Sequence, residues 1–358
     1  MPPQESTKAA TLPLESTPLI NVGNSTAPPL PTTALHNASV DEEDLTASIL
    51  PPPFAHKRLS ETPWLIWRNE LSGLVNLAFP VIGTYLLEML PGLVSIILVG
   101  HIHDTSQIEE YIDATSLAVM FMNLAGVSIG FGLSTALDTL CSQAYGAQET
   151  HRIGTYLQTG VLVLSGFLVM VAILFYNCTN ILVALGQPPL VAELAGQFTI
   201  YLLPGVPFLF FYELLRKVLQ AQNVAKPMLF VSIVANITNC GFGYYFVYHT
   251  EWGWLGAALA RTICNMSFLL CLLPYVIGSG LAKSFWTGIH VTEAIQGIPQ
   301  FLALGIPGML QLCFEWWAFE CLALLCGLLP NAVVSIGANA VILNVAKYGL
   351  HVLFGFIH

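Results

Sequence analysis

The chain has 358 residues, of which 55% are hydrophobic and only 9% are charged, with a mean hydropathy of +0.70 and a net charge of −10. A soluble domain carries about 25% charged residues, so this composition excludes an ordinary soluble protein and indicates an integral membrane protein. The sequence has no basic patch suited to phosphates, and we therefore predict no nucleic-acid partner.

The first 62 residues form a separate region by composition. They are rich in Pro, Thr and Ser and lack the apolar stretch of a secretory signal. So little apolar surface cannot offset the entropy lost on ordering. We therefore predict that residues 1–62 are a disordered cytoplasmic tail.

Eight apolar runs follow the tail, and each is long enough to cross a bilayer as a helix. They lie at residues 71–99, 114–141, 153–176, 190–214, 227–248, 254–278, 296–329 and 332–356. None alternates as the strands of a membrane barrel do, so the predicted fold class is all-α and polytopic. Candidate helix kinks are Pro80, Pro91, Pro204, Pro207 and Pro307.

Lysine and arginine residues alternate between the connections that join these spans. They precede the first span and recur in the second, fourth and sixth connections: Lys57, Arg58, Arg68; Arg152; Arg216, Lys217, Lys226; Lys283. The other connections contain none. By the positive-inside rule, the N-terminus and the C-terminus are predicted to be cytoplasmic. The spans themselves are predicted to contact the lipid bilayer.

Motifs of soluble catalytic sites are missing from the sequence. It contains no phosphate-binding G-x-x-x-x-G-K-[ST] loop, no H-E-x-x-H and no G-x-S-x-G motif. The eight cysteines form no C-x-x-C pair and have no histidine at ligand spacing. We therefore predict that the protein is not an enzyme and has no cofactor and no metal site.

Two acidic residues, Glu315 and Glu320, interrupt the apolar run from 298 to 329, which has no other charge. A carboxylate at such a depth costs about 2.5–3.5 kcal/mol on insertion scales, and residues of this kind usually line a cavity, an ion path or a proton relay. We predict that the two glutamates bind the substrate or a proton.

The neighbours of these glutamates suggest how a cation would be held. The two acids are five positions apart in sequence, which places them about 140° apart around a helix. Gln311 shares a face with Glu315, and Trp316 shares one with Glu320. The faces of Trp316 and Trp317 are predicted to stack on a flat cation. In the alternative, one acid pairs structurally with Arg261 or a backbone donor.

A repeated sequence pattern links this segment to the first span. Pro80 and Glu88 are eight residues apart, as are Pro307 and Glu315, and a leucine stands three residues before each proline. Many transporters consist of two repeated units with the substrate site between them. We therefore predict an N-lobe of six spans at residues 63–290 and a partial C-lobe of about two spans at 291–358. Glu88 either handles a proton or cation, or makes an interhelical hydrogen bond.

Residues 132–147, GLSTALDTLCSQAYGA, resemble the signature after the second helix in the eukaryotic branch of the MATE (multidrug and toxic compound extrusion) family. Further segments agree in order: 77–80 (LAFP), 100–101 (GH), 215–222 (LRKVLQAQ) with Pro227, 253–258 (GWLGAA) and 307–320 (PGMLQLCFEWWAFE). The resemblance implies an antiporter in the vacuolar or plasma membrane. It would export organic cations, xenobiotics or metabolites in exchange for H⁺ or Na⁺.

The resemblance also implies roles for single residues. Glu315 matches the glutamate of the E-W-W motif that is implicated in transport, and Glu320 matches its second acid. Asp138 and Gln143, at the cytoplasmic end of the second span, are expected to brace or gate the lobe. Independently of the resemblance, Glu213 stands beside Arg216 and Lys217 in the sequence and is expected to form a local ion pair with them.

The chain departs from the family pattern at its end. A second lobe built like the first would need four more helices after His358. A truncated chain is therefore expected, and two alternatives to a transporter stay open. One is a fragment that does not transport, and the other is a flippase for lipid-linked precursors from the same superfamily. The sequence gives no indication of the oligomeric state.

Overall fold

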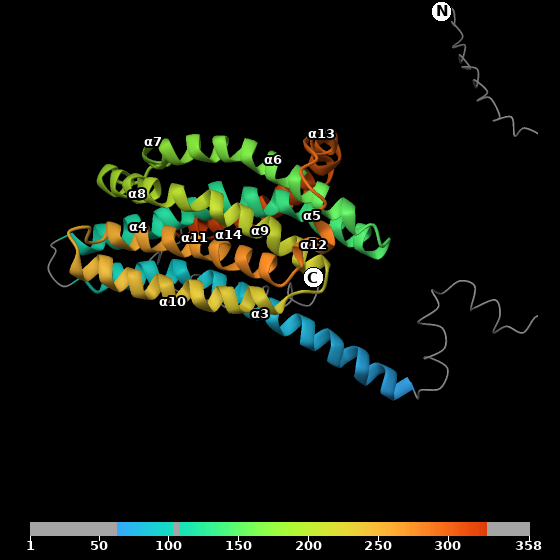
Figure 1. Cartoon of the computed structure of the whole chain (residues 1–358). Coiled ribbons are helices and arrows are strands. Elements are labelled where there is room, and N and C mark those ends of the chain that lie inside the picture. Colours follow the sequence, from blue (N-terminus) through green and yellow to red (C-terminus); the bar gives the residue numbers. More distant parts are fainter. Residues whose placement is uncertain (1–62, 103–106, 328–358) are drawn as a thin grey trace, which may run out of the picture. The chain divides into compact units, whose positions relative to one another are not determined.

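The computed structural model describes residues 63–102 and 107–327, and in these ranges it contains helices and no strand. The elements are α3 (Pro63–Gly100), α4 (Ile108–Met122), the π-helix η1 (Asn123–Val127), α5 (Ser128–Gly146), α6 (Thr150–Tyr176), α7 (Cys178–Ala184), α8 (Pro189–Leu202), the 3₁₀-helix η2 (Leu203–Gly205), α9 (Val206–Ala221), α10 (Lys226–His249), α11 (Leu255–Gly278), α12 (Ala282–Phe285), α13 (Val291–Gln296) and α14 (Ile298–Gly327). The predicted all-α class is confirmed (Figure 1).

Seven helical stretches in the described residues are long and apolar enough to cross a membrane. They are Leu71–Gly100, Ile108–Gly146, Thr150–Tyr176, Pro189–Ala221, Lys226–His249, Leu255–Gly278 and Ile298–Ala318. The first seven predicted spans are therefore confirmed, and the eighth, at 332–356, lies outside the described residues. In the fourth span a 3₁₀ turn at Leu203–Gly205 separates α8 from α9, so the α-helix is interrupted at Pro204, one of the predicted kink positions.

The prediction that Arg216 and Lys217 lie in a connection is wrong. Both belong to α9, which continues to Ala221, and their side chains are 0% and 3% exposed. Of the three basic residues predicted for this connection, only Lys226 lies beyond α9, at the start of α10. The physical reason is that both side chains have carboxylate partners inside the bundle, which removes the need for water around them.

Helices α3 and α10 run in parallel and are joined at two levels. Asn236 Nδ2 donates to the carbonyl oxygen of Leu87 at 2.9 Å, and Tyr248 OH donates to that of Leu98 at 2.8 Å. Pro91 has no N–H for the carbonyl four residues before it, which is that of Leu87. The Asn236 side chain therefore satisfies the acceptor that the proline leaves free. Figure 1 shows α10 beside α11, its main packing partner.

Helix α14 packs against α5, and glycines allow the close approach. A β-carbon at Gly132 would collide with the backbone of Met309, and one at Gly305 would lie 3.0 Å from the carbonyl oxygen of Leu133. Small residues let two membrane helices come together at backbone distance. Residues from Trp67 onward form one compact unit, described as far as Gly327. The division into lobes at residue 290 stays a prediction.

The connection between α11 and α14 is held against α6. Gln158 on α6 donates to the carbonyl oxygen of Gly288 at 2.7 Å and accepts from the backbone N–H of His290 at 2.8 Å. The short helices α12 and α13 both contact α6 (Figure 1). This connection fixes where α14 begins, and hence where its glutamates lie along the bundle.

Candidate functional site

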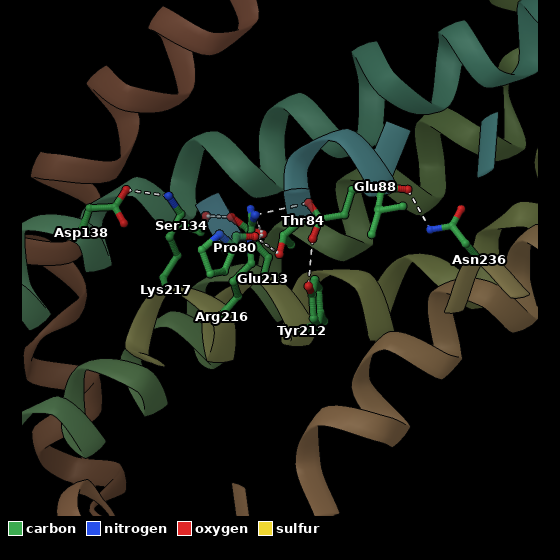
Figure 2. A network of polar contacts seen from close by, with 11 residues as sticks. Pro80, Thr84, Glu88, Ser134, Asp138, Tyr212, Glu213, Arg216, Lys217 and Asn236 are labelled. Carbon is green, nitrogen blue, oxygen red and sulfur yellow. Dashed lines mark hydrogen bonds and ion pairs between the residues drawn. The ribbon is translucent and has the colours of Figure 1, made fainter. Parts of the chain in front are cut away.

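A network of buried charges joins α3, α5 and α9. Glu88 comes from α3, Asp138 from α5, and Glu213, Arg216 and Lys217 from one turn of α9 (Figure 2). The three α9 side chains are all buried. Spacings of three and four residues put the acid and the two bases of α9 on neighbouring positions of the helix surface.

Arg216 lies at the centre of the network. Its Nη2 is 2.5 Å and its Nε 2.8 Å from Glu213 Oε2, and its Nη1 is 3.2 Å from Glu88 Oε2. The guanidinium carbon lies 4.5 Å from the centre of the Tyr85 ring, a cation–π distance. The predicted ion pair between Glu213 and Arg216 is confirmed. Removing one partner of such a buried pair leaves an uncompensated charge, which is the costly change.

Both carboxylate oxygens of Glu88 contact side chains of α9. Oε1 accepts a hydrogen bond from Tyr212 OH at 2.8 Å, while Oε2 pairs with Arg216. The first span offers no basic residue near Glu88, so its basic partner comes from α9, 128 residues away in sequence. The interhelical bond that the sequence left as an alternative is present, and a role in proton handling stays a prediction.

A third ion pair lies at the edge of the network. Lys217 Nζ is 2.7 Å from Asp138 Oδ2, and the two side chains are 4% and 26% exposed. This contact ties α5 to α9, while a gating role for Asp138 stays a prediction. Gln143 lies further along α5 and is exposed; the structure does not bring it into the network.

The charges of the network do not balance. Three carboxylates face two cations, so the fully ionised network has a net charge of −1. A buried charge without compensation is unfavourable. Chemically, such a cluster favours uptake of one proton or one cation. The described residues contain no group of three His, Cys, Asp or Glu side chains arranged to hold a metal ion.

The predicted α14 site is separate from this network. Glu315 is half-buried and forms no ion pair with a described residue, including Arg261. Trp316 packs against the core, whereas Gln311 is exposed and Trp317 is 50% exposed. The side chain of Glu320 lies outside the described residues.

The helix register gives the offset of the two sites along the bundle. Cys313 Sγ donates to Ser128 Oγ at 3.5 Å, so Glu315, two residues on, lies near the level of Gly126 on the antiparallel segment. Ser134, which donates to Glu213 in the network, is eight residues further along α5, or about 12 Å. Gly126 belongs to the π-helix η1, and α14 contacts η1. Such π-helical turns are frequent at functional sites.

Comparison with known proteins gives the family. A model of the MatE family matches residues 80–245. Multidrug and toxin extrusion protein 1 of Homo sapiens is 36% identical over 290 residues, which cover 81% of this chain and 50% of that protein. The same protein of Oryctolagus cuniculus is 36% identical over 280 residues, covering 78% and 48%. The chain belongs to the MATE family.

Solved structures agree with this assignment. The eukaryotic MATE transporter AtDTX14 superposes with a TM-score of 0.73 at 28% identity, covering 79% of this chain and 62% of that one. The Vibrio cholerae MATE transporter VcmN, at 17% identity and a TM-score of 0.65, shows the fold alone. This MATE chain is therefore a multi-pass membrane protein, and because its homologues are transporters, the prediction that it is not an enzyme is confirmed. It spans about half the length of the curated relatives it matches.

Sequence reasoning missed several members of the MATE chain's network. Tyr212, Ser134 and Tyr85 were not singled out, although each lies against a charged group of the network. The sequence offered one local signal that charged residues pair at this place. Glu213 and Arg216 stand three residues apart at the end of an apolar run, the spacing of one helical turn. The partners from α3 and α5 carry no comparable signal, because nothing local links them to α9.

Proposed function

We propose that this chain belongs to a MATE-type efflux system that exchanges organic cations, xenobiotics or metabolites for H⁺, with Na⁺ as the alternative coupling ion. The observation that carries the proposal is the pair of acidic sites: a buried network with one excess carboxylate, and Glu315 without an ion-pair partner among the described residues. A carboxylate that takes up a proton in one state and a cation in another performs the exchange.

In this proposal Glu315 is the exchange site. Its carboxylate binds either the proton or the substrate cation, and Trp316 and Trp317 offer aromatic faces to a flat cation. Glu320, as the second acid of the motif, and Gln311 are proposed to assist. The two occupants exclude each other because a single negative charge compensates only one of them.

Glu88 is proposed to couple protonation to helix movement. A proton on Glu88 would end its ion pair with Arg216, while Arg216 would keep its pair with Glu213. The polar contacts between α3 and α9 would then include the hydrogen bond from Tyr212 and the cation–π contact of Arg216 with Tyr85. Both termini are proposed to face the cytoplasm, in a vacuolar or plasma membrane, since Arg152, Lys226 and Lys283 still lie in or beside the connections at that end of the spans.

The test is uptake of a fluorescent organic cation into acid-inside proteoliposomes. We compare this chain, its Glu315→Gln variant and human multidrug and toxin extrusion protein 1. Uptake that depends on the pH gradient and is lost in Glu315→Gln supports the proposal. A matched control is Glu193→Gln, an exposed acid of α8, which is expected to keep the uptake. If the human protein takes up the fluorescent cation and this chain does not, the proposal that this chain transports is refuted.

A further inference from the structure

Arg261 on α11 is a buried cation without a counter-charge in the described residues. Its side chain belongs to a residue only 7% exposed, and its Nε and Nη1 atoms have no hydrogen-bond partner within the part of the chain that the structure describes. The four ion pairs found there all use other bases. Arginine does not lose its proton in proteins, so Arg261 stays charged.

The space around Arg261 is formed by three further helices. A β-carbon at Gly92 of α3 would lie 2.9 Å from Arg261 Nη1 and 3.3 Å from Val119 of α4. Helix α10 approaches α11 at the residue before Arg261: a β-carbon at Gly243 of α10 would lie 3.6 Å from the β-carbon of Ala260. The guanidinium of this α11 residue is therefore inside the bundle against α3 and α4, and α10 packs on the adjoining position of α11.

Neutral polar groups without partners lie within one helical turn of these contacts. Thr115 precedes Val119 by one turn, Asn265 follows Arg261 by one turn, and Asn239 precedes Gly243 by one turn. In the described residues, Thr115 Oγ1, Asn265 Nδ2 and both amide atoms of Asn239 are buried and form no hydrogen bond. Buried polar atoms are nearly always hydrogen-bonded in native proteins, so unpartnered atoms one helical turn from these contacts, together with the unpaired guanidinium, point to a ligand.

We propose that Arg261 binds a small monovalent anion inside the bundle, either an inorganic halide or the carboxylate of an organic anion. One guanidinium compensates one negative charge, while the hydroxyl and amide N–H groups complete the coordination without further charge. A dianion would leave one charge buried and unpaired. This site is distinct from the acidic network and from Glu315, and it gives the N-terminal spans an anion requirement that cation export does not predict.

The sequence contains acids whose side chains lie outside the described residues, Asp104 and Glu320 among them. Residues 328–358 contain no Asp or Glu. Asp104 lies between the two described ranges and is tested directly. If Asp104 were the counter-ion of Arg261, the protein would show no anion dependence, and Asp104→Asn would create one.

The experiment measures the thermal unfolding midpoint of the purified chain in lipid nanodiscs, with chloride, acetate or bulky gluconate as the sodium salt at constant ionic strength. We expect a saturable rise of the midpoint above that in gluconate, because a ligand that binds only the folded state stabilises it. A rise with chloride alone identifies an inorganic anion, and one with acetate alone identifies a carboxylate.

Three variants locate the site. Arg261→Gln is expected to abolish the rise, whereas Arg152→Gln, at an exposed arginine paired with Glu149, keeps it. Gly92→Ala retains the charge but places a methyl group against Nη1, and is expected to weaken the anion affinity by at least about tenfold. Equal midpoints in all three salts, a chloride response that survives Arg261→Gln, or a response gained only in Asp104→Asn would each overturn the proposal.

Discussion

The charge imbalance of the network predicts that its members respond very differently to neutralisation. Arg216→Gln leaves three carboxylates facing Lys217 alone, with Glu213 and Glu88 both losing their partner. Breaking a buried ion pair from one side costs about 3–5 kcal/mol. Glu88→Gln removes the excess carboxylate instead, and its amide oxygen still accepts the Tyr212 hydroxyl. We expect Glu88→Gln to cost at most about 1.5 kcal/mol.

The assay is reversible unfolding of each variant in mixed micelles, followed by circular dichroism, which gives the free energy of unfolding. Arg152→Gln is the matched control, because its ion pair with Glu149 is exposed and is worth at most about 1 kcal/mol. The double variant Arg216→Gln with Glu213→Gln should recover part of the loss, since it removes a positive and a negative charge together. Equal losses for Arg216→Gln and Glu88→Gln would refute the reasoning from charge imbalance.

Three further predictions concern packing and reactivity. Asn236→Leu leaves the Leu87 carbonyl without a donor and should lower the free energy of unfolding by about 1–3 kcal/mol in the same micelle assay. Gly132→Ala forces the backbone of Met309 away and should lower the unfolding midpoint through loss of α14 packing. Burial raises the pKa of the Cys178 thiol, so at pH 8 its thiolate fraction is reduced and maleimide labelling, followed by mass spectrometry, should be slow until the protein is unfolded.

Each of these predictions has a control in the same chain. Pro91→Ala restores the backbone N–H that pairs with Leu87, so it should reduce the cost of Asn236→Leu. Gly146→Ala adds a methyl group with nothing within 4 Å and should leave the midpoint unchanged. Labelling of Cys178 at the same rate in the folded and the unfolded protein would contradict the effect of burial.

Sequence reasoning located the spans because bilayer thickness and hydropathy act residue by residue. The run from 71 to 99 was enough to predict the helix that ends at Gly100, without knowledge of any neighbour. The ion pair between Glu213 and Arg216 was also accessible, because helix geometry alone brings residues three apart together. Both inferences depend on local chemistry.

The same reasoning misplaced Arg216 and Lys217, and the cause is informative. Counting basic residues by connection assumes that a charge near the end of an apolar run lies in water. Glu88 and Asp138, which are 128 and 79 residues away in sequence, allow both bases to remain inside α9. A hydropathy profile cannot represent these ion pairs, because a profile sums the transfer costs of single residues.

By itself, the sequence determined a polytopic helical membrane protein with acids in its first and seventh spans, and its motifs determined the MATE family. Only the tertiary structure decided which charges meet. It placed Glu88 in a network with α9 and left Arg261 without a carboxylate among the described residues. The level of Ser134, which donates to Glu213 in that network, is about 12 Å along the bundle from the level of Glu315. The physical reason is that the transfer cost of a residue is a property of its side chain, whereas the compensation of a buried charge depends on contacts between helices distant in sequence.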